Sequence, residues 1–395
     1  MRILIVNPFL PYYGGASAAV AHLSAYLTSK GIDNAILTSL VTKKFIQETE
    51  SLGLNIITKS LPLHDDSVFR ASFLERIKFV MSNLLELRAY VDMHKRHYDI
   101  INPHNWPANW ASILHRKPVI WMMNEPLNLY SIESLEHARL WLKIITNCGI
   151  MADRFLMRNY VDQICVNSYL TYRQAKRKYG VNPEVVFFGV DYDFYSESSP
   201  EDLEKIMGKY DLYKKFVVLT SGGLVPQKNQ LASIKAIEAV RNIIPNVKLI
   251  LAGGGEERYI NMLRAYVKSK KLDSHVVFTG HLSKYGISNM YHVAHVGLYP
   301  TKEQGGLLAP FETLAAGTPV IISTVNGASE LIMKYKLGIV TENYVNAVIE
   351  VYNNYELYKN MAQRAREVVK NDFSWDKYSE RLMRIFEDVY NKRKR

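Results

Sequence analysis

The residues best suited to chemistry lie in one stretch of the chain, a glycine loop followed by a helix start. An apolar run at 294–299 predicts a buried parallel strand, and Gly305 and Gly306 after it let the backbone approach a ligand closely. Residues 310–316 read as the first turns of a helix. Free amides and the helix dipole suit a phosphate, and the Glu312 carboxylate suits two vicinal hydroxyls. The stretch predicts a site for a nucleotide that carries a sugar, against the alternative of a plain turn and a solvated glutamate.

A second loop of the same kind lies upstream. The strand expected at 216–220 is followed by a turn that contains Gly222, Gly223 and Lys228, and an apolar-periodic helix is expected at about 231–241. The pattern predicts a second strand-turn-helix unit with a basic residue beside its loop.

The N-terminus opens with the same pattern. A strand at 3–6 leads into the turn with Gly14 and Gly15, and a helix follows that ends near Gly31. The turn lacks the G-x-G-x-x-G spacing, and no acidic residue ends the next strand at 34–38. A dehydrogenase is therefore disfavoured, and a plain tight turn remains the alternative.

His104 ends another expected strand, which begins near Tyr98. The carboxyl end of a strand is where an open α/β sheet presents reactive side chains. His104 is predicted either to be a functional side chain at this strand end or to be a satisfied structural histidine.

These loops need strands and helices in alternation, and the sequence supplies them in two halves that each begin again. The fold class expected is α/β, with two Rossmann-like domains whose parallel sheets face an interdomain cleft. The 395 residues and 48% hydrophobic content suit two folded domains. The domains are predicted at 1–195 and 196–374, with the acidic segment 196–204 as a hinge and a final helix at 375–395.

Composition narrows the partners and the location. The net charge is +11, which attracts polyanions, but no nucleic-acid-binding motif accompanies it. We expect solvated charge first, peripheral contact with an anionic membrane second, and no nucleic acid. The short apolar run at the N-terminus and the lack of a long apolar stretch predict a cytoplasmic protein. Cys148 and Cys165 lack metal-ligand spacing and are expected as core thiols.

The stretch from Gln304 to Glu312 resembles the E-x7-E signature of retaining glycosyltransferases of family 4, and the resemblance continues into the residues AAGTPVIIS and Gly327-Ala-Ser-Glu330. The turn before Lys228 resembles the family's G-R-L-x-x-x-K loop, in which an arginine and a lysine clamp the donor diphosphate. His104 matches the second histidine of the family's H-x-H strand end, which implies a place near the donor sugar as a ligand of a hydroxyl. The resemblance covers nearly the whole chain and implies the GT-B architecture, in which the final helix, 375–395, returns to the first domain.

The family also implies roles for residues. A hexose would move with retention from a nucleotide-diphosphate sugar to a glycan or lipid-linked acceptor. No cofactor is implied, and Asp191-Tyr-Asp193 lies in the interdomain link, so no catalytic metal is expected. The residues implied in catalysis are His104, Lys228, Gln304 and Glu312, and those implied in donor binding are Gly14, Gly15, Gly222, Gly223, Gly254, Gly305, Gly306, Leu307 and Leu308.

Two positions depart from the family pattern. Gln304 occupies the place of the first glutamate, with Glu303 one residue earlier, and Gly223 occupies the place of the clamp arginine. A glutamine can bind a hydroxyl but lends no charge to an oxocarbenium-like transition state. These departures motivate two alternatives, a non-catalytic subunit that binds a partner and a nucleotide-sugar epimerase.

Overall fold

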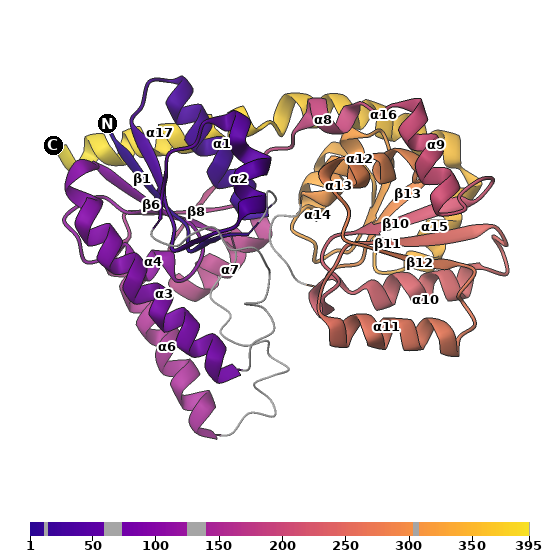
Figure 1. Cartoon of the computed structure of the whole chain (residues 1–395), viewed down its shortest axis with the longest axis horizontal. Helices are drawn as coiled ribbons and strands as arrows, with labels where there is room; N and C mark the ends of the chain where they lie inside the picture. The colour runs from indigo at the N-terminus through magenta and orange to yellow at the C-terminus, as the bar shows by residue number, and fades with distance from the viewer. Residues whose placement is uncertain (12–14, 59–72, 125–139, 303–307, 395) are drawn as a thin grey trace. The chain divides into compact units, whose positions relative to one another are not determined.

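The computed structural model describes residues 1–11, 15–58, 73–124, 140–302 and 308–394, and the chain divides into two compact units (Figure 1). Unit 1 is Met1–Gly189 with Trp375–Arg395, and unit 2 is Val190–Ser374. Each unit is built on parallel strands connected by helices, which confirms the predicted fold class.

Unit 1 holds a parallel sheet in the order β5-β3-β1-β6, and β6 continues through two parallel bridges, Ile101 to Val119 and His104 to Met122, into the order β7-β8-β9. The order reverses between β1 and β6, and ligands of open α/β sheets bind at the carboxyl ends of the strands at such a point. The strands are β1 (Ile3–Val6), β3 (Asn34–Leu37), β5 (Ile56–Ile57), β6 (Ile100–Pro103), β7 (Ile120–Met123), β8 (Gln163–Val166) and β9 (Glu184–Val185), with a separate parallel pair of β2 (Phe9–Leu10) and β4 (Leu40–Val41).

Helices connect and cover these strands. The C-terminal helix packs on the first helix of the unit, where the rings of His22 and Trp375 stack with centroids 4.7 Å apart (Figure 1). The helices are α1 (Gly15–Ser29), α2 (Lys43–Thr49), α3 (Phe73–His94), α4 (Ala108–Ala111), α6 (Leu140–Tyr160), α7 (Tyr169–Tyr179) and α17 (Trp375–Lys394). None of the helices in the described ranges combines the length and apolarity needed to cross a membrane.

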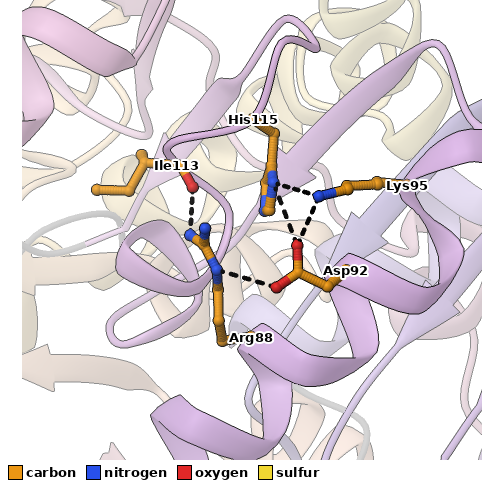
Figure 2. A network of polar contacts seen from close by, with 5 residues as sticks. All are labelled: Arg88, Asp92, Lys95, Ile113 and His115. Atoms are coloured by element: carbon orange, nitrogen blue, oxygen red, sulfur yellow. Dashed lines mark hydrogen bonds and ion pairs between the residues drawn. The ribbon is translucent and has the colours of Figure 1, made fainter.

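A polar network ties α3 to the segment after α4 (Figure 2). The Asp92 carboxylate lies 2.7 Å from Lys95 Nζ, 3.4 Å from Arg88 Nε and 3.5 Å from His115 Nδ1. Arg88 also donates to the carbonyl of Ile113. Lys95 and His115 shortly precede β6 and β7, so the network lies at the amino ends of these parallel strands, opposite the edge where ligands bind.

Unit 2 holds one parallel sheet of six strands in the order β12-β11-β10-β13-β14-β15. Here the order reverses between β10 and β13. Burial of every residue in β10, β11 and β13 fits a parallel sheet covered on both faces. The strands are β10 (Phe216–Ser221), β11 (Val247–Ala252), β12 (Val276–Gly280), β13 (Val296–Tyr299), β14 (Val320–Ile322) and β15 (Ile339–Val340), and the helices are α8 (Tyr192–Ser196), α9 (Pro200–Lys209), α10 (Gln230–Val240), α11 (Glu257–Ser269), α12 (Lys284–Val293), α13 (Ala309–Ala315), α14 (Ser329–Tyr335), α15 (Tyr344–Asn353) and α16 (Tyr355–Asp372).

Three local features differ from the sequence-based expectations. Unit 1 ends at Gly189 instead of residue 195, because Val190 pairs with Ser374 and α8 packs on α13 and α16 of unit 2. The expected hinge at 196–204 is in large part helix α9, for which Pro200 at the first position and two acidic residues in the first turn are a suitable start. The expectation for Cys148 was wrong, because it lies exposed on α6, whereas Cys165 is buried in β8.

Candidate active site

A small pocket opens in unit 2 at the carboxyl ends of β10 and β13, where the strand order reverses. The residues that line it carry hydroxyls and one ammonium, and they are Thr220, Ser221, Lys228, Tyr299, Thr301, Ala309 and Pro310. Hydroxyl donors and a cation together suit a phosphate group. Lys228 thus lies in the pocket that the strand topology alone marks as the ligand site.

Hydrogen bonds hold the two loops of this pocket against each other. Asn229, the residue after Lys228, has a left-handed backbone with φ 55° and donates from Nδ2 to the Pro300 carbonyl at 3.0 Å. The Lys302 amide donates to the Gln227 carbonyl at 2.8 Å. The loop that carries Lys228 is therefore fixed to the loop that leads toward Gln304.

Glu312 lies in the first turn of α13 and is half-buried. Its Oε2 accepts a hydrogen bond of 2.8 Å from Tyr291 Oη, and Tyr195 also hydrogen-bonds the carboxylate. Burial raises the pKa of Glu312, while the hydrogen bonds from Tyr291 and Tyr195 oppose that rise. Burial also raises the pKa of Tyr291 well above its usual range, so the phenol stays protonated and donates.

A cluster of hydroxyls connects Glu312 with the pocket. Ser221 Oγ lies 3.2 Å from both Tyr291 Oη and Tyr299 Oη, and Tyr299 Oη lies 2.5 Å from Thr313 Oγ1. Each of these hydroxyls has a partner, so the cluster is rigid. The Glu312 carboxylate and the Lys228 pocket therefore share one supporting set of side chains.

Tyr195, from the segment just after the boundary between the units, also contacts this hydroxyl cluster. It belongs to α8, and its ring packs at 5.7 Å from that of Tyr291. In the same segment, Asp191 accepts an ion pair of 2.7 Å from Lys284, whose ammonium also lies 4.1 Å from the Phe194 ring. Asp191, the first residue of the Asp191-Tyr-Asp193 segment, thus has a structural role in this ion pair.

The glycine turns after β10 and β11 pack against each other. A side chain at Gly253 would place its Cβ 2.1 Å from the Gly222 carbonyl oxygen, and one at Gly255 would lie 2.2 Å from the Leu224 oxygen. Glycine is therefore needed at both positions. The predicted donor glycines Gly222, Gly223 and Gly254 lie in these two turns, and the Gly223 carbonyl accepts from Gln230 Nε2 at 2.9 Å.

Five predicted residues lie outside the described ranges, and two of their neighbours are placed. The five are Gly14, Gln304, Gly305, Gly306 and Leu307. Gly15 is the first residue of α1 and has φ 53°. Leu308 precedes α13, and its carbonyl accepts from the amide of Glu312 at 3.0 Å. The roles assigned to these seven residues stay predictions.

His104 is fully buried at the end of β6 in unit 1. Its Nε2 lies 2.9 Å from Asn102 Oδ1, and Asn102 Nδ2 donates to the Ile120 carbonyl. Because Asn102 donates through its nitrogen, its oxygen is the acceptor and His104 Nε2 carries the proton. Burial lowers the pKa of His104 to about 3, so the imidazole is neutral.

A row of asparagines crosses the same edge of unit 1. Asn7, Asn105, Asn124 and Asn167, the asparagine row, follow β1, β6, β7 and β8, which are neighbours in the sheet. Asn124 Nδ2 donates to Asn105 Oδ1 at 2.7 Å, and Asn105 Nδ2 donates to Asn7 Oδ1 at 3.3 Å. Asn167 Nδ2 donates to the Asn124 carbonyl at 3.1 Å. Neutral amides thus span the point where the strand order reverses.

The sequence analysis predicted Glu312 as a site residue but missed the side chains that hydrogen-bond its carboxylate. It did not single out Tyr195 or Tyr291, which lie on other helices and carry no motif. Asn124 and Asn167 were not among the predicted site residues. In the sequence, an asparagine follows each of β1, β6, β7 and β8. This pattern indicates a shared site only once these strands are known to be neighbours in the sheet. Within the described ranges, no group of three or more acidic, histidine or cysteine side chains is placed to hold a metal ion.

Comparison with known proteins identifies a family for both halves of the chain. Residues 13–194 match the family model described as Glycosyltransferase Family 4, and residues 202–368 match the one described as Glycosyl transferases group 1. The boundary between the two matches falls close to the boundary of the units.

Curated relatives and solved structures agree with these matches. A UDP-Gal:alpha-D-GlcNAc-diphosphoundecaprenol alpha-1,3-galactosyltransferase of Escherichia coli is 25% identical over 89% of this chain and 95% of its own. A GDP-mannose-dependent alpha-(1-6)-phosphatidylinositol monomannoside mannosyltransferase of Mycobacterium tuberculosis is 28% identical over 49% of this chain, and the chain spans about half of that relative's length, 53%. The structure of Anabaena Alr3699/HepE in complex with UDP-glucose superposes with a TM-score of 0.77 at 17% identity, covering 98% of this chain and 100% of that one.

Proposed function

Because the chain belongs to the glycosyltransferases of the GT-B fold that are similar to family 4, we propose that it transfers a hexose from a nucleotide-diphosphate sugar to a glycan or lipid-linked acceptor, with retention. The observation that carries the proposal is the pocket of unit 2, in which Lys228 and several hydroxyls lie at the reversal of strand order. Relatives named for GDP-mannose and UDP-galactose make these the first donors to try.

Unit 2 would bind the nucleotide-sugar donor. Lys228 would bind the diphosphate and stabilise the negative charge that grows on it as the sugar leaves. Glu312, oriented by Tyr291, would bind the ribose hydroxyls. The amides of residues 305–308 would add hydrogen bonds to the same phosphate, as the sequence predicts. Charge-assisted hydrogen bonds of this kind are the strong ones in proteins.

The chemical step would exchange one bond at the anomeric carbon. The bond to the diphosphate oxygen breaks, the acceptor hydroxyl oxygen bonds to the same face of that carbon, and the hydroxyl proton leaves with the diphosphate or to water. His104 would accept a hydrogen bond from a sugar hydroxyl, because an imidazole whose pKa is lowered to about 3 is too weak a base to hold that proton.

A nucleotide-release assay tests the proposal. The purified chain is given UDP-, GDP- and ADP-hexoses with a mixture of glycan and lipid-linked acceptors, and the released nucleotide is measured. We expect release from one donor class and a fall in kcat/KM of about tenfold or more in Glu312→Ala, since the variant loses hydrogen bonds to the ribose. Glu356→Ala, at an exposed position in α16, is the matched control.

The products separate the alternatives. Retention predicts an anomeric proton of the product with the configuration of the donor sugar, read by NMR. Isomerisation of the donor without any acceptor would indicate an epimerase. Absence of turnover, with no shift of the melting temperature by any nucleotide, would contradict the proposal and indicate a non-catalytic subunit.

We also propose a peripheral location at the cytoplasmic face of an anionic membrane. The net charge of +11 supports it, as do the exposed apolar side chains Leu85 on α3 and Met151 and Phe155 on α6. Co-sedimentation with vesicles that contain phosphatidylglycerol, compared with vesicles of phosphatidylcholine, measures it. Equal recovery with both vesicles would contradict it.

A further inference from the structure

Both ends of unit 2 contact α13, the helix that carries Glu312. Unit 2 spans residues 190–374, and its first and last residues pair in a parallel bridge. Shortly after the first of them, α8 packs on α13 and brings Tyr195 to the Glu312 carboxylate (Figure 1). Shortly before the last, the ring of Phe373 stacks on that of Phe311, with centroids 4.7 Å apart. The start of α13 is therefore held by both of the segments through which the chain enters and leaves this unit.

Ionic and polar contacts fasten α8 on either side of Tyr195. Before it, Asp191 forms an ion pair of 2.7 Å with Lys284, the first residue of α12. After it, the Ser196 carbonyl accepts a hydrogen bond of 3.0 Å from Arg366 of α16. Tyr195 itself is only 7% exposed. Its phenol is thus held in place by the protein alone, and such preorganisation lowers the entropic cost of binding a ligand.

The Glu312 carboxylate has two phenol donors, and their number decides what else it can bind. Tyr291 donates to Oε2 at 2.8 Å, and Tyr195 also hydrogen-bonds the carboxylate. An ionised carboxylate can accept about four hydrogen bonds. The phenols use two of these positions, which leaves two for a ligand, and two neighbouring hydroxyls on one ring need that number. Glu312 is half-buried, so the residue is not fully enclosed.

We propose that Tyr195 is a positioning residue for the nucleotide: its hydroxyl turns the Glu312 carboxylate so that both free acceptor positions meet the two hydroxyls of a ribose, which gives unit 2 a preference for ribonucleotides over deoxyribonucleotides. This role deepens the proposed function and rests on it for the binding of ribose by Glu312. Tyr195 touches the carboxylate and acts on the ligand only through it. Loss of the hydroxyl leaves the carboxylate with one phenol and free to rotate, so a ribose loses its advantage over a deoxyribose.

Binding of nucleotides to the intact chain tests the proposal without any turnover. The dissociation constants of UDP, GDP and ADP, and of their 2′-deoxy and 3′-deoxy analogues, are measured by isothermal titration calorimetry. The wild type should bind the ribonucleotide more tightly, and Tyr195→Phe should lower that preference by about three- to tenfold, the effect of one hydrogen bond. Binding of the deoxy analogues should change by about twofold at most. Tyr192→Phe, which removes a hydroxyl from the same helix, is the matched control and should keep the wild-type preference.

The outcomes against the proposal are distinct. A wild type without a ribonucleotide preference overturns it, and so does a folded Tyr195→Phe variant that keeps the preference. Equal weakening of the ribonucleotide and its deoxy analogues in Tyr195→Phe would mean that the residue acts through packing, and this also overturns the proposal. If Tyr195→Phe does not fold, as judged by its melting curve, Asp191→Asn carries the test through its pH dependence.

The charges around Glu312 provide this second arm. Burial raises the pKa of Glu312, and the negative charge of Asp191 raises it further. The hydrogen bond from Tyr195 and the positive charge of Lys284 lower it. Tyr195→Phe should therefore raise this pKa, and Asp191→Asn should lower it. The titratable and charged groups that the described residues place around the carboxylate are Tyr195, Tyr291, Tyr299, Lys284 and Asp191.

The ribonucleotide preference should decrease as Glu312 takes up a proton, because a protonated carboxyl has fewer free acceptor positions. The ratio of the two dissociation constants is the quantity to follow, since titration of the phosphates affects both nucleotides alike. As the pH is lowered from neutral, the preference should be lost at a higher pH in Tyr195→Phe than in the wild type, and at a lower pH in Asp191→Asn. Shifts of the two variants in the same direction, or the absence of a shift in Asp191→Asn, would contradict the positioning role.

The two proposals fail separately. Nucleotide release with an unchanged preference in Tyr195→Phe leaves the transferase reaction standing and removes the positioning role. A preference that Tyr195→Phe lowers, without nucleotide release from any donor, leaves the role standing and removes the reaction. Absence of binding by every nucleotide contradicts both.

Discussion

The two units carry the same kind of ligand edge with opposite chemistry. In both, the strand order reverses at a point where the carboxyl ends of parallel strands present their side chains. In unit 2 this edge holds the Lys228 ammonium, the Glu312 carboxylate and the phenols that orient it. Among the described residues, the same edge of unit 1 holds amides and a neutral histidine. The charged edge suits a diphosphate and the neutral edge suits sugar hydroxyls.

Unit 1 also carries a charged network at the other end of its strands. The network of Arg88, Asp92, Lys95 and His115 lies at the amino ends of β6 and β7 (Figure 2). It joins α3 to the segment after α4. Substitutions at the two edges of the sheets are therefore expected to have different effects on activity and stability.

The largest effect is expected from the charged edge. Lys228→Ala removes the ammonium from the pocket and should lower kcat/KM for nucleotide release by about 10- to 100-fold, since a hydrogen bond to a charged group contributes about 1.5–3 kcal/mol. Lys268→Ala, exposed on α11, is the control with the same charge change. Equal activity of the two variants would break the assignment of the diphosphate to this pocket.

The site residues of unit 2 could be predicted from the sequence better than those of unit 1. Lys228 and Glu312 stand in short local patterns, a glycine turn and a helix start, and local patterns survive in a single sequence. Tyr291 lies on α12, 21 residues before Glu312, and no spacing rule links the two. Asn7 and Asn105 are 98 residues apart, so their contact depends on β1 and β6 being neighbours in space. The strands and helices were predictable from periodicity, whereas the spatial order of the strands was not.

On the neutral edge, the strongest expectation concerns pH. A histidine that has a pKa of about 3 when folded and about 6.5 when unfolded stabilises the fold fully above the unfolded value, and this stability is lost as the pH falls toward the folded value. Because of His104, the free energy of unfolding of unit 1 should therefore fall by about 2 kcal/mol between about pH 7 and pH 5. His104→Gln should remove that part of the pH dependence.

Urea unfolding followed by tryptophan fluorescence measures this, because all five tryptophans fall within unit 1. His94→Gln is the control, since His94 is on the same unit at the end of α3. If wild type and His104→Gln lose the same stability over that pH range, the histidine is not held neutral and the edge is not uncharged.

A smaller effect should come from the support of Glu312. Tyr291→Phe removes a hydrogen bond that favours the ionised carboxylate, so the pKa of Glu312 should rise further. The acid limb of the kcat/KM profile for nucleotide release should then move to higher pH, with a loss at neutral pH of about threefold. Tyr285→Phe, exposed on the same helix, is the control. A uniform loss at every pH would mean that Tyr291 acts on packing and not on the carboxylate.

The smallest effect should come from the charges that unit 1 keeps away from its edge. Asp92→Ala removes the carboxylate shared by Arg88, Lys95 and His115, but its side chain is 43% exposed, so water screens these pairs. The variant should lose about 0.5–1 kcal/mol of unit 1 stability, less at high salt, and release nucleotide at the wild-type rate. Asp202→Ala, which breaks the more exposed pair with Lys205 in unit 2, should cost less still. A loss of activity in Asp92→Ala without a loss of stability would show that charge does reach the ligand edge of unit 1, and the contrast between the two edges would then no longer hold.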